Sequence, residues 1–133
     1  MNNNGNDVIL CVDDDKIILH AMMQQLSTCI DDSVTIELCE SGDEALEVLE
    51  ELMKEGYNVP IVVTDQMMNE MNGDELITIA KDKFPEVKFI LLTGYSRESF
   101  EKLTELENLE EIVIKPWERD DLKRILSKFY PTK

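Results

Sequence analysis

The chain has 133 residues, of which 43% are hydrophobic, and its 29 acidic and 13 basic residues give a formal net charge of -16. This length fits one domain that can bury a sizeable core, and the apolar content argues against disorder. Phosphate backbones select basic surfaces, so the charge argues against nucleic-acid binding by this domain. No apolar run is long enough to span a bilayer, and we expect no membrane partner.

The two ends of the chain and its cysteines bear on its targeting and its cellular compartment. Residues 1–6 lack the basic and apolar parts of a signal peptide, so we expect a disordered N-terminal tail there. Residues 131–133 are expected to be a tail or the start of a linker. Three cysteines lie inside apolar segments without C-x-x-C spacing: Cys11, Cys29 and Cys39. Buried reduced thiols in a cytoplasmic protein are the interpretation that fits them.

Strand-like and helix-like patterns alternate five times along the chain. The strand-like segments are Val8–Val12, Val34–Leu38, Val59–Thr64, Val87–Leu92 and Ile112–Ile114. Helical spacing of apolar residues follows each of them: Ile18, Met22, Leu26 and Ile30; Ala45, Leu49, Leu52 and Met53; Leu76, Ile77 and Ala80; Phe100, Leu103 and Leu106; Leu122, Ile125, Leu126 and Phe129. Ser96 is the expected N-cap of the fourth helix.

This alternation predicts an α/β domain. Strands that alternate with helices imply right-handed crossovers and a parallel sheet. The segments Val59–Thr64 and Val87–Leu92 are nearly continuous apolar runs, which predicts strands in the middle of the sheet with both faces covered.

Polar and charged side chains stand where four of these strands end. Asp13 and Asp14 follow the first strand, Asp65 the third, Thr93 the fourth and Lys115 the fifth. In an open parallel sheet, ligands bind outside the carboxyl ends of the strands. Three carboxylates, a hydroxyl and an ammonium at one edge predict a site for a divalent cation and a phosphoryl group.

The chemistry of such a site requires a cation. Two unit charges about 4 Å apart cost roughly 4 kcal/mol at an effective dielectric constant near 20, so gathered carboxylates need raised pKa values or a bound metal. Oxygen ligands with few histidines and cysteines favour Mg²⁺. One carboxylate can then attack phosphorus. Lys115 and the Thr93 hydroxyl suit the phosphoryl oxygens that gain charge during the transfer.

Four segments together resemble the signature of two-component response-regulator receiver domains: Cys11–Asp15, Val63–Gly73, Leu92–Tyr95 and Ile114–Pro116. The similarity spans residues 7–130, and the order and spacing of the segments make it specific. The resemblance implies a flavodoxin-like fold, which is a single doubly wound sheet of five parallel strands in the order 2-1-3-4-5 with five helices.

The resemblance also implies the metal ligands and the phosphoacceptor. It makes Asp65 the residue that accepts a phosphoryl group from a sensor histidine kinase or a histidine phosphotransfer protein. It makes Asp14 a direct Mg²⁺ ligand and Asp13 a ligand that acts largely through water. Asp65 itself and the backbone carbonyl of Met67 complete the expected ligand set.

The remaining roles follow from the same resemblance. Thr93 is expected to supply a hydroxyl that swings toward the phosphoryl group, and Lys115 its ionic partner, with the Lys115–Pro116 bond often cis in such domains. Phosphorylation then changes the surface that binds a downstream effector protein or a covalently linked output domain, and it could also drive formation of a homodimer. The expected activity is regulatory rather than enzymatic, limited to phosphoryl transfer and hydrolysis at Asp65.

The sequence departs from the family pattern at a few positions. Asn69 stands where the loop after the acceptor usually has proline. Ile112 stands where many members have Tyr or Phe, so an aromatic rotamer switch cannot occur there. Met67 and Tyr95 flank the site without the carboxylate or amide that could orient an attacking water, which predicts a long-lived phosphorylated state.

Two other functions compete with this interpretation. A haloacid-dehalogenase-type phosphatase also uses an aspartyl phosphate, Mg²⁺, a Thr or Ser and a Lys, but its nucleophile lies in a D-x-D-x-[TV] motif. The segment Asp13–Ile17 has the carboxylates without the final Thr or Val. A receiver-like interaction module that works without phosphorylation is the second alternative, and the complete acidic set argues against it.

Overall fold

The computed structural model describes residues 6–94 and 100–130. Five parallel strands form one sheet in the order β2-β1-β3-β4-β5. They are β1 (Asp7–Val12), β2 (Thr35–Cys39), β3 (Asn58–Asp65), β4 (Lys88–Thr93) and β5 (Leu109–Ile114). The flavodoxin-like strand order is thereby confirmed, with β3 at the centre of the sheet.

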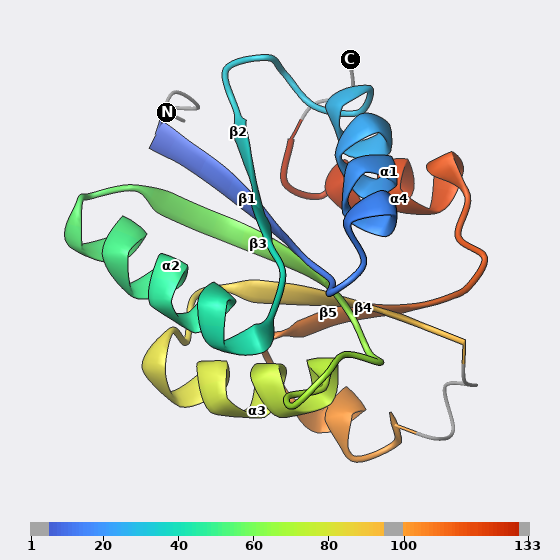
Figure 1. The fold of residues 1–133 in the computed structure, drawn as a ribbon. Coiled ribbons are helices and arrows are strands. Elements are labelled where there is room, and N and C mark those ends of the chain that lie inside the picture. Colours follow the sequence, from blue (N-terminus) through green and yellow to red (C-terminus); the bar gives the residue numbers. More distant parts are fainter. Residues whose placement is uncertain (1–5, 95–99, 131–133) are drawn as a thin grey trace.

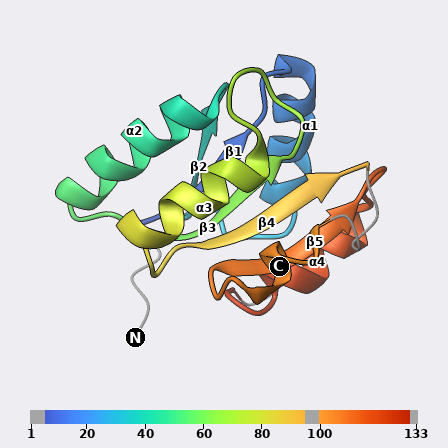
Figure 2. The same cartoon turned by 90° about the horizontal axis from the view of Figure 1, so that it is seen from below.

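Helices cover both faces of this sheet. They are α1 (Lys16–Ser27), α2 (Gly42–Lys54), α3 (Gly73–Lys83) and α4 (Arg119–Leu126). Figures 1 and 2 show α1 and α4 side by side on one face, and α2 with α3 on the other. This arrangement is the doubly wound one, because crossovers of one hand place helices on opposite faces when the direction of winding reverses beside β1.

The core consists of two apolar layers divided by the sheet. Successive side chains of a strand point to opposite faces, so Val62 packs with α2 and α3, whereas Ile61 and Val63 pack with α1 and α4. All three side chains are fully buried. Each such burial contributes about 1.5–3 kcal/mol, which explains why the middle strands are nearly continuous apolar runs.

The fourth predicted helix is a correction. Ser96, its expected N-cap, lies outside the described residues, and from Glu101 the chain forms 3-10 turns that include the 3-10 helix η3 (Leu103–Glu105). Leu106 N–H donates to the Leu103 carbonyl at 2.9 Å. Phe100, Leu103 and Leu106 are three residues apart, a spacing that fits the three residues per turn of a 3-10 helix as well as it fits an α-helix. The described part therefore has four α-helices rather than five.

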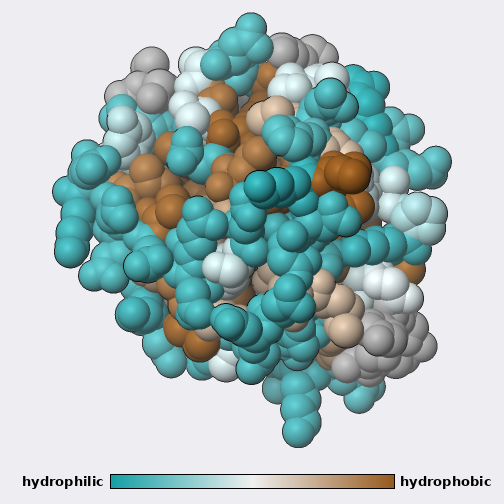
Figure 3. Space-filling model, in the orientation of Figure 1, coloured by the Kyte–Doolittle hydropathy of each residue, from teal (hydrophilic) through white to brown (hydrophobic). Residues whose placement is uncertain are grey.

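Polar side chains cover much of the surface. The face in Figure 3 is mostly hydrophilic, with small apolar areas between the polar side chains. In the described ranges, every helix is too short or too polar to cross a membrane.

Candidate functional site

The strand register aligns the polar strand ends at one edge of the sheet. Across this edge the paired residues are Val12 with Thr64, Asp65 with Leu92, and Thr93 with Ile114. β1 and β5 end at an apolar residue, whereas β3 and β4 end in Asp65 and Thr93 themselves. The polar side chains at these strand ends, or directly after them, therefore meet at the carboxyl edge. In Figure 1 the ends of β1 and β3 lie together there.

Asp65 and Lys115 form an ion pair at this edge. Lys115 Nζ contacts Asp65 Oδ1, and Asp65 Oδ2 accepts a hydrogen bond from Met67 N–H at 3.1 Å. The Asp65 side chain is only 5% exposed, whereas that of Lys115 is 32% exposed. The backbone N–H of Lys115 donates to the Thr93 carbonyl at 2.7 Å, which ties the lysine to β4. The carboxylate is therefore buried, oriented and neutralised, with its lysine partner open to solvent on one side.

Asp13 lies beside this pair and is also buried, with 3% of its surface exposed. Its Oδ1 accepts from Asp15 N–H at 2.9 Å, whereas its Oδ2 has no hydrogen-bond partner in the described part of the chain. Burial raises the pKa of Asp13 to about 6, and the charge of Asp65 adds to that rise, against the lowering effects of the Asp15 N–H and of Lys115. A buried carboxylate oxygen without a partner fits a position for a cation or a water bound to it.

Asp14 points elsewhere. Its side chain is exposed, and its Oδ2 accepts from Asn69 N–H at 2.8 Å, so it holds the loop after β3. Among the described residues, three or more acidic, histidine or cysteine side chains are nowhere grouped closely enough to hold a metal. Mg²⁺ usually takes one or two carboxylates and keeps several waters. Asp13 and Asp65 fit that smaller ligand set, while Asp14 Oδ2 is engaged by the Asn69 N–H.

The other predicted residues are placed as follows. Thr93 is 1% exposed at the end of β4. The Lys115–Pro116 peptide bond is cis, as the resemblance implied. Met67 is 55% exposed, and Ile112 is buried in β5. Tyr95 lies outside the described residues.

Gln66 and Gly73 support the site and were not predicted from the sequence. Gln66 is buried, and its Oε1 accepts from Asp74 N–H at 2.8 Å at the start of α3, while Gly73 N–H donates to the Gln66 carbonyl at 2.9 Å. A Cβ on Gly73 would lie 2.5 Å from the Asp65 carbonyl oxygen. Glycine is needed because the helix starts against the backbone of the acceptor. The position of Gly73, eight residues after Asp65 in the sequence, was the signal from which this role could have been predicted.

Comparisons with known proteins agree with this geometry. The model of the response regulator receiver domain family matches residues 9–127. Sensor kinase CckA of Brucella abortus is 34% identical over 96 residues, which cover 72% of this chain and 10% of that protein. Response regulator protein VraR of Staphylococcus saprophyticus is 25% identical over 122 residues, 92% of this chain and 56% of that protein. The chain thus spans between a tenth and about half of these curated relatives.

A solved structure extends the comparison to three dimensions. Response regulator protein TrrA of Thermotoga maritima, in complex with Mg²⁺-BeF, superposes with a TM-score of 0.74 at 28% identity, covering 92% of this chain and 97% of that one. The family match extends over most of the chain, and the strand-end residues lie in the expected register. The chain belongs to the response regulator receiver domain family.

Proposed function

We propose that this chain is a phosphorylation-controlled signalling switch in which Asp65 accepts the phosphoryl group. The observation that carries this proposal is the buried Asp65 carboxylate, paired with Lys115 and adjacent to the unpartnered Oδ2 of Asp13. A desolvated carboxylate held by a cationic partner at the strand ends suits nucleophilic attack on phosphorus better than a structural role.

The transfer uses the side chains at this edge. An Asp65 oxygen forms a bond to phosphorus while the bond between phosphorus and the donor's histidine nitrogen breaks. The electron pair stays on that nitrogen, which takes up a proton. Lys115 follows the negative charge from the carboxylate to a phosphoryl oxygen, and the Thr93 hydroxyl donates to another. The hydrogen bond from Met67 N–H to Asp65 Oδ2 keeps the nucleophile oriented.

Asp13, Asp14, Asp65 and the Met67 backbone carbonyl are the residues that would hold Mg²⁺. When bound, Mg²⁺ supplies charge neutralisation between the carboxylates and the phosphoryl oxygens. The unpartnered oxygen of Asp13 supports this assignment, as does the relative TrrA, which was solved with Mg²⁺-BeF.

Partners follow from the same role. We infer that residues 7–130 form a cytoplasmic receiver domain, which receives its phosphoryl group from a sensor histidine kinase or a histidine phosphotransfer protein. The output is a downstream effector protein or a covalently linked output domain, and phosphorylation can favour a homodimer. The named relatives support these classes, since one is a sensor kinase and the other a response regulator, each longer than this chain.

The test is direct phosphorylation with acetyl phosphate and Mg²⁺. Intact-mass spectrometry should show one added phosphoryl group on the wild type and none on Asp65→Ala. Asp15→Ala is the matched control, because the Asp15 carboxylate caps α1 by accepting from Ile17 N–H at 2.9 Å and faces no reacting group. Equal labelling of Asp65→Ala and the wild type would show that Asp65 is not the phosphoacceptor. Labelling lost only in Asp13→Ala would favour the phosphatase alternative.

A further inference from the structure

The chain segment that follows Lys115 is fastened to the end of α1. The indole Nε1–H of Trp117 donates to Gln25 Oε1, and Arg119 Nε–H donates to Thr28 Oγ1 at 2.9 Å. Gln25 is in the last turn of α1, and Thr28 is its C-cap. Trp117 and Arg119 therefore both form hydrogen bonds with the end of α1, which is about 90 residues away in sequence.

Lys115 is held on its other side by the sheet. Its N–H donates to the Thr93 carbonyl at 2.7 Å, and its ammonium reaches Asp65. Between Lys115 and Trp117 stands Pro116, whose ring fixes φ and which has no N–H to donate. One of the backbone torsions between the anchored indole and Lys115 is therefore fixed, so a displacement of Trp117 is transmitted in part to the backbone of Lys115.

The indole of Trp117 packs in part against the core layer beneath α1 and α4, and it also borders a hollow. A hollow of about 420 Å³ lies between α1 and this segment, lined by Ile18, Gln25, Lys115, Pro116 and Trp117. Ile18 and Gln25 are seven residues apart and share one side of the helix. The hollow leaves the indole some room to move on that side. Removing the Gln25 amide would leave the partly buried indole N–H without its partner.

We propose that Gln25 is a positioning residue for Lys115, acting through the indole of Trp117. The inference rests on the proposed function, since it concerns how accurately the ammonium meets the phosphoryl group. Misplacement by about 1 Å can cost roughly 100-fold in rate. A loosened anchor two residues from the lysine moves it less, so we expect loss of the Gln25 amide to slow phosphorylation by about 3- to 10-fold.

The experiment compares phosphorylation rates with acetyl phosphate and Mg²⁺ for the wild type, Gln25→Leu and Thr28→Val. Thr28→Val is the matched control. It removes the contact of Arg119 and the hydrogen bond from the Thr28 hydroxyl to the Gln25 carbonyl at 2.7 Å, but it keeps the Gln25 amide that accepts from the indole. We expect a slower rate only in Gln25→Leu. Urea unfolding of each variant separates this effect from a general loss of folded protein.

Two further measurements tie the effect to the indole. Trp117→Phe keeps an aromatic ring without the donor, and it should slow the reaction about as much as Gln25→Leu does. In that background Gln25→Leu should have no additional effect. Trp117 is the one tryptophan of the chain, so its single indole N–H resonance should shift and exchange faster with solvent in Gln25→Leu before any phosphodonor is added.

The outcomes distinguish a positioning role of Gln25 from a purely structural one. The inference is supported if phosphorylation is slower in Gln25→Leu and unchanged in Thr28→Val. In the Trp117→Phe background, adding Gln25→Leu should then slow it no further. Equal slowing of Gln25→Leu and Thr28→Val overturns it. So do additive effects of Gln25→Leu and Trp117→Phe in the double variant, or an unaltered indole resonance in Gln25→Leu. A wild type that labels normally together with an equally fast Gln25→Leu overturns this inference alone, whereas a wild type that takes no phosphoryl group overturns the proposed function, and this inference with it.

Discussion

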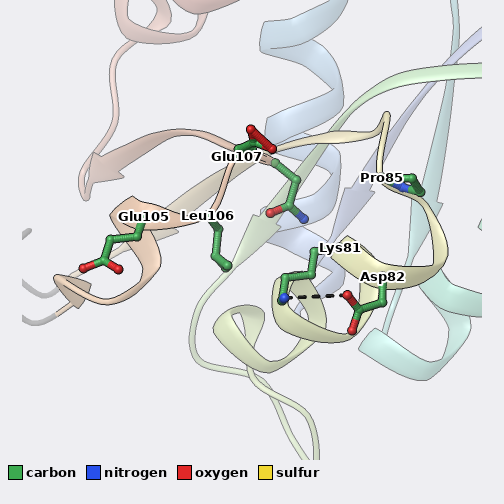
Figure 4. Close-up of a pocket in the computed structure, with 7 residues that line it drawn as sticks. Lys81, Asp82, Pro85, Glu105, Leu106 and Glu107 are labelled. Carbon is green, nitrogen blue, oxygen red and sulfur yellow. Dashed lines mark ion pairs between the residues drawn. The ribbon is translucent and has the colours of Figure 1, made fainter.

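The charged side chains are exposed at the amino end of the sheet and buried at its carboxyl end. At the amino ends of β4 and β5, a pocket of about 390 Å³ is lined by Lys81, Asp82, Glu105 and Glu107 with three neighbours (Figure 4). The ion pair there, between Lys81 Nζ and Asp82 Oδ1 at 3.6 Å, has side chains 40% and 81% exposed. Such surface pairs contribute little and rearrange freely in water.

At the carboxyl end the charges are buried instead. The Asp65 side chain of the Lys115 pair is 5% exposed, and Asp13 beside it is similarly buried. Desolvation makes each charge depend on its neighbours, so a new charge on a phosphoryl group would alter the whole cluster. Hollows of similar size border both ends, so the burial of charge is what distinguishes the carboxyl end from the amino end.

Removing the lysine from each end should produce the largest contrast. We expect Lys115→Ala to slow phosphorylation by acetyl phosphate by about 10- to 100-fold, because the phosphoryl oxygens lose a preorganised cation. Lys81→Ala should leave the rate unchanged, since its ammonium lies in solvent near Asp82. Rates from intact-mass time courses would measure both, and a comparable slowing in Lys81→Ala would break the comparison.

Buried charge at the carboxyl end should also appear in the pH dependence of stability. The pKa of Asp13 is about 6 in the folded state against an ordinary value of 3.8, so the folded state binds the proton more tightly than the unfolded state. This contribution is complete at low pH and is lost as pH rises through about 6. Asp13→Asn, which cannot ionise, avoids that loss.

In metal-free buffer with a chelator, the free energy of unfolding of Asp13→Asn relative to wild type should therefore rise by about 2 kcal/mol between pH 4 and pH 7. Urea titrations at several pH values would measure it. Stability curves that run parallel for the two proteins would show that Asp13 is not desolvated as the structure indicates. Added Mg²⁺ should stabilise the wild type more than Asp13→Asn at pH 7.

A tyrosine at the amino end should affect stability alone. Tyr130 is buried, and its hydroxyl donates to Asp7 Oδ2 at 2.7 Å at the start of β1. Burial and the hydrogen bond to Asp7 raise the pKa of Tyr130 above its usual range, so the hydroxyl stays protonated. We expect Tyr130→Phe to lower the free energy of unfolding by about 1 kcal/mol and to leave the phosphorylation rate unchanged.

Tyr57→Phe is the control for that measurement, because the Tyr57 side chain is 40% exposed. Its unfolding free energy should stay within about 0.5 kcal/mol of the wild type. A slower phosphorylation rate in Tyr130→Phe would mean that the two ends of the sheet are coupled.

The sequence was sufficient to predict which residues lie at the carboxyl edge of the sheet, because these residues stand at the ends of recognisable strands. Asp13, Asp65, Thr93 and Lys115 each come at or directly after the end of a parallel strand, and the register of such strands brings them together. The predicted middle strands are confirmed for the same reason, since their apolar runs require cover on both faces. These features depend on periodicity and order, which a single sequence carries.

Other features were not predicted or differ from the prediction, because the spacing of residues does not reveal them. Asp14 follows Asp13 directly, yet its carboxylate turns to the Asn69 N–H, a choice of rotamer that spacing does not reveal. The expected helix near Leu103 contains 3-10 turns, because a three-residue spacing fits both helix types. The bond between Trp117 and Gln25 joins residues far apart in sequence, and only the packed fold brings them together.

The smallest predicted effect concerns the lifetime of the phosphorylated state. Met67 is 55% exposed beside Asp65, and its thioether cannot align a water for attack on phosphorus. Because orientation is a large part of such rates, Met67→Asn, which supplies an amide, should shorten the phosphoryl half-life by about 2- to 5-fold. Following loss of the added mass in one buffer after removal of acetyl phosphate would measure it, with Met67→Leu as an apolar control of similar size. Half-lives that are equal in all three proteins would mean that the Met67 side chain stays directed away from phosphorus, so that the exposed side of the site does not set the hydrolysis rate.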